Sequence, residues 1–187
     1  MSESKLGKMM HNYALLWMLF LVLPVWADDF AIENIRQTYT QIHSSLPSLK
    51  ASEFESGLQS TEGVQAVKHQ DQQGKIKLIK LTVFGEMGNN LSEYYYQDQQ
   101  VVFVLTSERR YNAPIYLNAT KAKELGIAAF DPKKTTLTEN RYYFKAEQLL
   151  RWLDNNKYPI KSSEPRFKRE AKRVLSESKK LLTKAKN

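Results

Sequence analysis

The stretch EYYYQDQQVVFVLT, residues 93–106, decides the fold class of this chain. Its two halves are rich in aromatic and β-branched residues, which favour strands, and the polar tetrapeptide QDQQ separates them. A second copy, YYFKAEQLLRWL at residues 142–153, matches the first in seven of twelve positions, by identity or by chemical class. Each copy therefore predicts a β-hairpin whose first strand carries consecutive aromatic residues.

A third hairpin is predicted upstream of these two. The stretch IKLIKLTVF at residues 76–84 alternates apolar and polar residues, and VQAVKH at residues 64–69 alternates more weakly. The turn sequence QDQQG joins them, and its first four letters recur in the second hairpin. We expect residues 64–84, 91–106 and 140–154 to form three adjacent hairpins in one antiparallel meander of about six strands.

A helix is predicted at each end of the meander, because apolar residues recur there at helical spacing. The N-terminal stripe ends before Pro47, and residues 48–63 form a polar connector. The C-terminal helix covers residues 164–185, with lysine and arginine on its other face. The fold class is therefore α+β. The two apolar stripes are Ala31, Ile35, Tyr39, Ile42 and Leu46, and Phe167, Ala171, Val174, Ser178, Leu181 and Ala185.

Residues 1–27 have the three-part pattern of a secretory signal peptide. Lys5 and Lys8 precede an apolar run of about 13 residues, and VWA at residues 25–27 offers small residues at a cleavage site. The alternative is a retained anchor, but such a run spans only about 20 Å as a helix, against a hydrocarbon core of about 30 Å. We predict cleavage after Ala27 and a soluble periplasmic protein.

The basic charge of the mature chain is confined to its C-terminal tail. Residues 28–156, the predicted meander domain, hold 15 Lys+Arg and 16 Asp+Glu, whereas residues 157–187 hold 11 and 3. Export makes nucleic acid an unexpected partner, and a basic amphipathic helix is typical of binding to anionic lipid or lipopolysaccharide. The candidate contacts with an anionic surface are Arg166, Lys168, Arg169, Lys172, Arg173, Lys179 and Lys180.

The same tail helix offers few large apolar side chains. Five large residues must offset the ordering of about 22 residues, so we expect marginal docking on the body. A helix of this kind would contribute surface chemistry more than stability. Truncation after Tyr158 should then leave the body folded.

No pattern of residues indicates catalysis or metal binding. The chain has no cysteine, and only His43 and His69 remain after the predicted cleavage. Nucleophile elbows, zinc-binding motifs and glycine-rich phosphate loops are absent. We expect a non-enzymatic protein with no cofactor, no metal and no catalytic residue. The alternative is a hydrolase whose carboxylates are brought together only by folding.

The aromatic strands are the most distinctive candidate for a binding surface. Consecutive aromatic residues point to both faces of a strand, so one set should pack under the helices while the other stays half exposed. The competing interpretation is ordinary cross-strand packing. We expect a binding or accessory module that presents an aromatic sheet face to a small ligand or an envelope protein. The candidate ligand-binding residues are Tyr94, Tyr96, Tyr142, Phe144 and Trp152.

Several stretches of the body together carry a family resemblance. They are FGEMG at residues 84–88, EYYY at 93–96, RYNAPIY at 110–116, ENRYYF at 139–144 and LLRWLD at 149–154. They resemble a group of small, functionally uncharacterised, exported proteins of Gram-negative bacteria with recurring E-Y-Y-F-x-x-G-x-L hairpins, and are distantly similar to MORN-type repeats. The resemblance implies a periplasmic location and a β-meander, and no catalytic residue.

This chain departs from that pattern at the hairpin turns. Gln99 and Glu147 stand where the group has a turn glycine, so the turn type is open. Between the second and third hairpins, residues 111–137 are the least regular part of the body. An interaction surface could most easily lie there.

Overall fold

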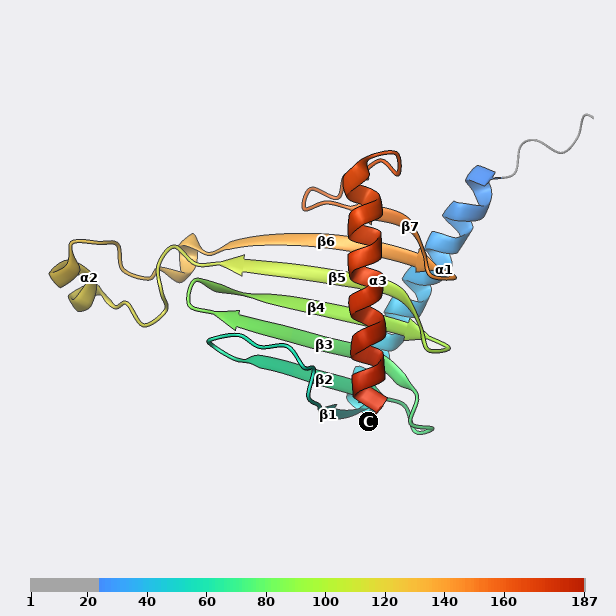
Figure 1. Ribbon diagram of the computed structural model, residues 1–187, viewed down its shortest axis with the longest axis horizontal. Coiled ribbons are helices and arrows are strands. Elements are labelled where there is room, and N and C mark those ends of the chain that lie inside the picture. Colours follow the sequence, from blue (N-terminus) through green and yellow to red (C-terminus); the bar gives the residue numbers. More distant parts are fainter. Residues whose placement is uncertain (1–23, 187) are drawn as a thin grey trace, which may run out of the picture.

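The chain folds around one seven-stranded antiparallel sheet in which strands that follow each other in the sequence lie side by side (Figure 1). The structure is a computed structural model that describes residues 24–186. The predicted α+β class, with a helix at each end of a meander, is confirmed. The strands are β1 Lys50–Glu53, β2 Val64–Gln70, β3 Ile76–Gly85, β4 Gly88–Gln97, β5 Gln100–Arg110, β6 Thr136–Lys145 and β7 Gln148–Leu153.

All three predicted hairpins form, as β2–β3, β4–β5 and β6–β7. They also pair with one another, so the meander is continuous. The sheet has one strand more than these three hairpins supply, because β1 lies in the segment predicted to be a polar connector. Its four residues, KASE, show no strand pattern and are held only by pairing with β2.

The two aromatic hairpins are alike in detail, as their sequences predict. Asp98 and Gln99 turn the first hairpin with φ of 48° and 62°, and Ala146 and Glu147 turn the other with φ of 46° and 64°. Two successive left-handed residues form the turn that best fits the twist of a hairpin, although glycine or asparagine usually fills it. Each hairpin also has a register shift within its aromatic run.

Two long helices cover opposite faces of the sheet (Figure 1). Helix α1, Pro24–Ser45, is followed by the short 3-10 helix η1, Leu46–Ser48, and packs on one face. Helix α3, Pro165–Lys186, crosses the strands on the other face. The predicted signal peptide lies outside the described residues except for residues 24–27, which belong to α1, and its cleavage stays a prediction.

Helix α3 packs its apolar stripe into the main hydrophobic core, although its sequence predicts marginal docking. Its residues Phe167, Val174, Leu181 and Ala185 are buried in one cluster with residues of β2 to β7. The Tyr96 hydroxyl donates a hydrogen bond to the Ser178 carbonyl oxygen at 3.2 Å. The earlier estimate counted only the apolar side chains of the helix and omitted the sheet residues that the helix removes from water.

A protruding segment, residues 111–135, leaves the sheet between β5 and β6 and extends away from both helices (Figure 1). We call it the arm. It contains helix α2, Ala119–Leu125, and the 3-10 helix η2, Pro132–Lys134. Ala113, Leu117 and Ala122 form a small core of its own. The Asn112 side chain closes the base of the arm, because it donates to the Ala129 carbonyl and accepts from the Asp131 amide at 2.9 Å each.

Candidate functional site

The predicted aromatic binding face is not exposed. Tyr94, Tyr96, Tyr142 and Phe144 are each at most 2% exposed and lie in the core under α3. The neighbouring Tyr95 and Tyr143 are buried in the second core, under α1. Since a helix covers the aromatic rows on each face of the sheet, neither set stays half exposed. The aromatic hairpins therefore serve packing, and the expectation of an exposed aromatic face is corrected.

Trp152 is the only one of the five candidate ligand-binding residues with partial exposure. Its indole stacks on Tyr142 with ring centroids 5.6 Å apart, and the Arg166 guanidinium lies 5.6 Å from the indole centroid on the helix side. The indole N–H donates to Asn140 Oδ1 at 2.9 Å. These contacts occupy the ring and its polar atom, so Trp152 anchors the N-terminal end of α3.

Three of the seven candidate cations of α3 form ion pairs with carboxylates of the same chain. Arg166 pairs with Glu164 at 2.7 Å, and Lys179 pairs with Glu147 at 2.6 Å across the β6–β7 turn. Arg173 pairs with both acidic residues of the helix, at 2.7 Å to Glu170 and 2.9 Å to Glu177. The pair between Lys179 and Glu147 links α3 to the sheet, and Arg173 pairs with the acidic residues of the helix itself.

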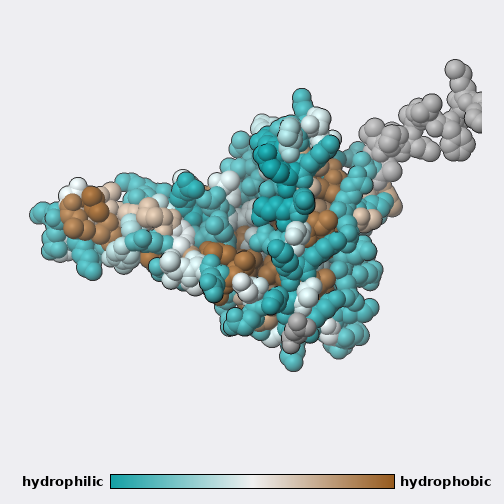
Figure 2. All heavy atoms as spheres, viewed as in Figure 1, coloured by the Kyte–Doolittle hydropathy of each residue, from teal (hydrophilic) through white to brown (hydrophobic). Residues whose placement is uncertain are grey.

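Four of the remaining cations, together with Lys184, form a surface on which no cation is in an ion pair with a described residue, and we call it the basic face of α3. Within residues 24–186, none of them has a carboxylate within 4.0 Å. All are exposed, and they extend over about 24 Å of helix at 1.5 Å per residue. Figure 2 shows the outward side of α3 as a largely hydrophilic ridge. The basic face consists of Lys168, Arg169, Lys172, Lys180 and Lys184, of which the sequence-based candidates omitted Lys184.

The acidic residues of α3 lie on the flank of the helix that faces the strands. The Tyr142 hydroxyl donates to Glu170 at 2.8 Å, and Arg173 donates two further hydrogen bonds to the same carboxylate. The bonds from Arg173, helped by Tyr142, hold the pKa of Glu170 below its usual value despite partial burial. Burial, together with the bond to Glu170, raises the pKa of Tyr142.

A polar hollow of about 350 Å³ lies beside this network, over the part of the sheet that α3 leaves open. Ser92, Thr106 and Asn140 form its floor, and Glu170 and Glu177 line the helix side. Arg173 bridges these two carboxylates, so Glu170 stays ionised at neutral pH. Glu170 therefore offers hydrogen-bond acceptors and lacks the raised pKa that a general acid needs. Glu108 of β5 also lines the hollow, so three carboxylates lie around it, and the carboxylate-based hydrolase stays a prediction.

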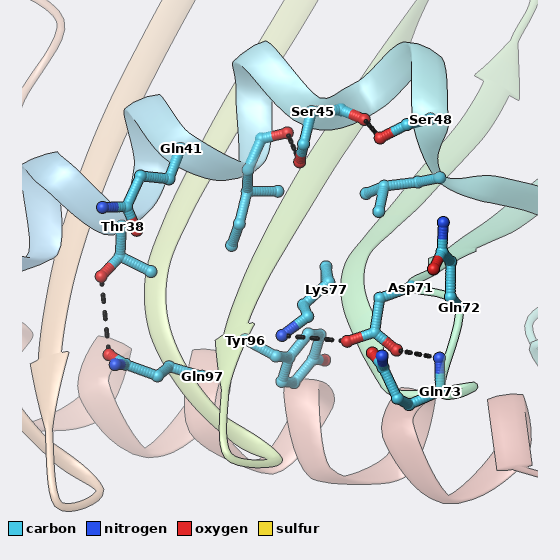
Figure 3. A pocket seen from close by; sticks show the side chains of 12 residues that line it. Thr38, Gln41, Ser45, Ser48, Asp71, Gln72, Gln73, Lys77, Tyr96 and Gln97 are labelled. Carbon is cyan, nitrogen blue, oxygen red and sulfur yellow. Dashed lines mark hydrogen bonds and ion pairs between the residues drawn. The ribbon is translucent and has the colours of Figure 1, made fainter.

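A second pocket, of about 450 Å³, lies on the other side of the sheet, between the end of α1 and the β2–β3 turn (Figure 3). The side chains around it are mostly amides and hydroxyls. Ser45 and Ser48 donate to backbone carbonyls of their own segment, and Thr38 bonds Gln97 across the pocket at 3.5 Å. Most of its polar groups thus stabilise local structure.

Asp71 is the one acidic residue lining that pocket, and it organises the turn. Its carboxylate accepts backbone hydrogen bonds from Gln73 at 3.0 Å and Lys75 at 2.9 Å, and pairs with Lys77 at 3.2 Å. Although burial opposes ionisation, these contacts lower the pKa of Asp71. Asp71 therefore holds the β2–β3 turn in place, and its carboxylate is no proton donor at neutral pH.

The arm carries an unusual share of exposed apolar side chains. Ile115, Leu125 and Ile127 are each more than half exposed, and Figure 2 shows apolar atoms at the end of the arm. Tyr116 is also exposed, and its hydroxyl donates to Glu86 in the β3–β4 turn. The arm is therefore a structured projection with an apolar tip, in the segment where an interaction surface was expected.

No family model, no curated protein and no solved structure matches this chain. Within residues 24–186, no helix is long and apolar enough to cross a membrane, and no three histidine or acidic residues converge to hold a metal ion. The basic face of α3 is thus the site that the structure defines most clearly among those predicted from the sequence.

Proposed function

We propose that this protein is an exported, non-enzymatic accessory module of the cell envelope that docks on an anionic lipid or lipopolysaccharide surface through the basic face of α3. The observation that supports this most directly is the separation of charge on one helix. Both acids of α3 lie on its inner flank, where each pairs with Arg173, whereas the charged residues on the outward side are all cations.

The way α3 is held also bears on the mode of binding. Its apolar stripe is already buried against the sheet, so it is not free to insert into lipid. Binding would therefore depend on charge. Residues three or four positions apart on a helix lie about 5–6 Å from one another, less than the Debye length of about 8 Å at physiological salt. Lys168, Arg169 and Lys172 would consequently act together on an anionic surface, and so would Lys180 and Lys184.

The expected strength follows from the number of cations. A lysine or arginine near an anionic leaflet contributes about 1 kcal/mol. Neutralising Lys168, Arg169, Lys172 and Lys180 should then weaken binding by about 4 kcal/mol, or roughly a thousandfold. The effect should shrink as salt rises, because exposed charges are screened.

The arm offers a control with the same change of net charge. The test measures co-sedimentation with phosphatidylglycerol and phosphatidylcholine vesicles at low salt, using chains that begin at Asp28. One variant replaces the four cations above by glutamine, and the other replaces Lys121, Lys123, Lys133 and Lys134, which are all exposed. The proposal expects the first variant to lose binding to the anionic vesicles and the second to keep most of it. Equal losses would mean that net charge, and not the basic face, controls binding.

A further inference from the structure

A crevice of about 560 Å³ runs between the C-terminal half of α3 and the loop that connects β1 to β2. Ser56, Gly57 and Leu58 form the loop side, and Lys180, Leu181 and Lys184 are among the residues on the helix side. Its volume lies within the range of about 300–1,000 Å³ usual for small-molecule sites. This crevice therefore lies along one edge of the basic face.

The loop side of the crevice presents one large apolar side chain and contacts helix α3. Leu58 is 46% exposed, and its amide donates to the Ser56 hydroxyl at 3.2 Å. Gly57 has a φ of +77°, and a Cβ atom placed there would lie 3.7 Å from Lys184 Cε. The loop thus rests against the stem of Lys184. Leu58 and the methylene stems of Lys180 and Lys184 together give the crevice its apolar lining.

The helix side combines an apolar base with a cationic rim. Leu181 is buried in the main core at the base, and the ammonium groups of Lys180 and Lys184 stand one helical turn apart. Neither lysine has a carboxylate within 4.0 Å in the described part of the chain. Glu177, the acidic residue that lines the crevice, is paired with Arg173 at 2.9 Å. The unpaired charge of the crevice is therefore positive.

We propose that this crevice receives the acyl chain of an anionic lipid, whose phosphate lies between Lys180 and Lys184. An apolar lining with two cations at one edge matches a molecule with a hydrocarbon chain and a phosphate. A free phosphate would leave Leu58 without a role. This inference rests on the proposed function and deepens it, because it adds the capture of one lipid molecule to the attraction of the basic face.

The test uses lysophosphatidylglycerol below its micelle concentration, with binding followed by calorimetry and native mass spectrometry. The expected result is one saturable site per chain, with weaker binding of lysophosphatidylcholine and none of glycerol phosphate. Leu58→Gln should weaken binding about tenfold. The double variant K180Q/K184Q should weaken it about thirtyfold. Leu125→Gln, at another exposed leucine, on the arm, is the control and should bind like the wild type.

The outcomes separate this inference from the proposed function. The crevice assignment is overturned if no stoichiometric complex forms, if Leu58→Gln binds as tightly as Leu125→Gln, or if glycerol phosphate binds equally well. In each of these cases, vesicle binding that still depends on the basic face leaves the proposed function standing. If vesicle binding does not depend on the cations of the basic face, the proposed function itself is refuted.

Discussion

Replacing Leu181 by alanine tests whether α3 belongs to the core of the protein. Leu181 is 3% exposed and packs in the cluster that joins α3 to the sheet. A buried Leu→Ala change costs about 2–5 kcal/mol, because apolar contacts are lost and a cavity remains. The total stability of a domain is typically about 5–15 kcal/mol, so this single change removes a large part of it. For a domain of this size, each kcal/mol lowers the melting temperature by about 2–4 °C.

The assay is urea unfolding followed by far-UV circular dichroism and by aromatic fluorescence. Both signals should shift together, because helix and sheet unfold as one unit. Leu125→Ala on the arm is the control and should change stability by no more than about 0.5 kcal/mol, since Leu125 is 65% exposed. Equal stability of the two variants, or a separate early transition of helical signal, would refute the reasoning and restore the interpretation of α3 as a marginally docked tail.

Three further predictions concern the flank network, a turn and the arm. Because the pKa of Glu170 is lowered in the folded state, its contribution is present above the ordinary value of 4.5 and lost as the pH falls through the folded pKa. Urea midpoints of wild type and Glu170→Gln should therefore differ at pH 7 and converge in acid; a constant difference would contradict this. Ala146→Gly should stabilise the fold by about 0.5–1 kcal/mol. The change relieves the strain of an alanine in the left-handed conformation, although the greater freedom of glycine in the unfolded chain offsets part of this stabilisation. A lower urea midpoint for the variant would contradict this prediction. Replacing residues 113–130 by a short glycine–serine linker should change the melting temperature by only about 2 °C, because the arm has its own core; loss of a cooperative melt would show that the arm supports the sheet.

The meander could be predicted because its signals are local. Alternation over residues 76–84 and the repeated turn QDQQ each act within a few residues, and the structure has the expected hairpins. Strand β1 could not be predicted in the same way. Its four residues have no periodicity, and it becomes a strand only through its register with β2, from Lys50 opposite Gln70 to Glu53 opposite Val67.

The burial of the aromatic residues depends on how three elements come together. The sequence places tyrosines on both faces of β4 and shows that two helices have apolar stripes. It does not show that the helices take opposite faces, which is what buries Tyr94 under α3 and Tyr95 under α1. The estimate of how strongly α3 docks also lacked this information, because it could not include the sheet residues that α3 covers.

The sequence predicts that the tail is rich in basic residues, but it does not predict which of these residues form ion pairs. The excess of lysine and arginine in the tail is evident from counting. That Lys179 is paired depends on Glu147, 32 residues earlier in the chain, while Lys184 stays unpaired. The crevice depends on a loop near Leu58 that meets α3 more than 120 residues later. Contacts over such distances in sequence carry no local signal.

The orientation of the protein on an anionic vesicle tests the central claim most directly. The chain has no cysteine, so one environment-sensitive label can be placed at Ser176→Cys on the outward side of α3, or at Asn34→Cys on the exposed side of α1. These positions lie on opposite faces of the sheet. On phosphatidylglycerol vesicles that contain a surface quencher, the account predicts strong quenching of the label at position 176 and little at position 34. Equal quenching of both labels, or stronger quenching at position 34, would contradict docking through the basic face of α3.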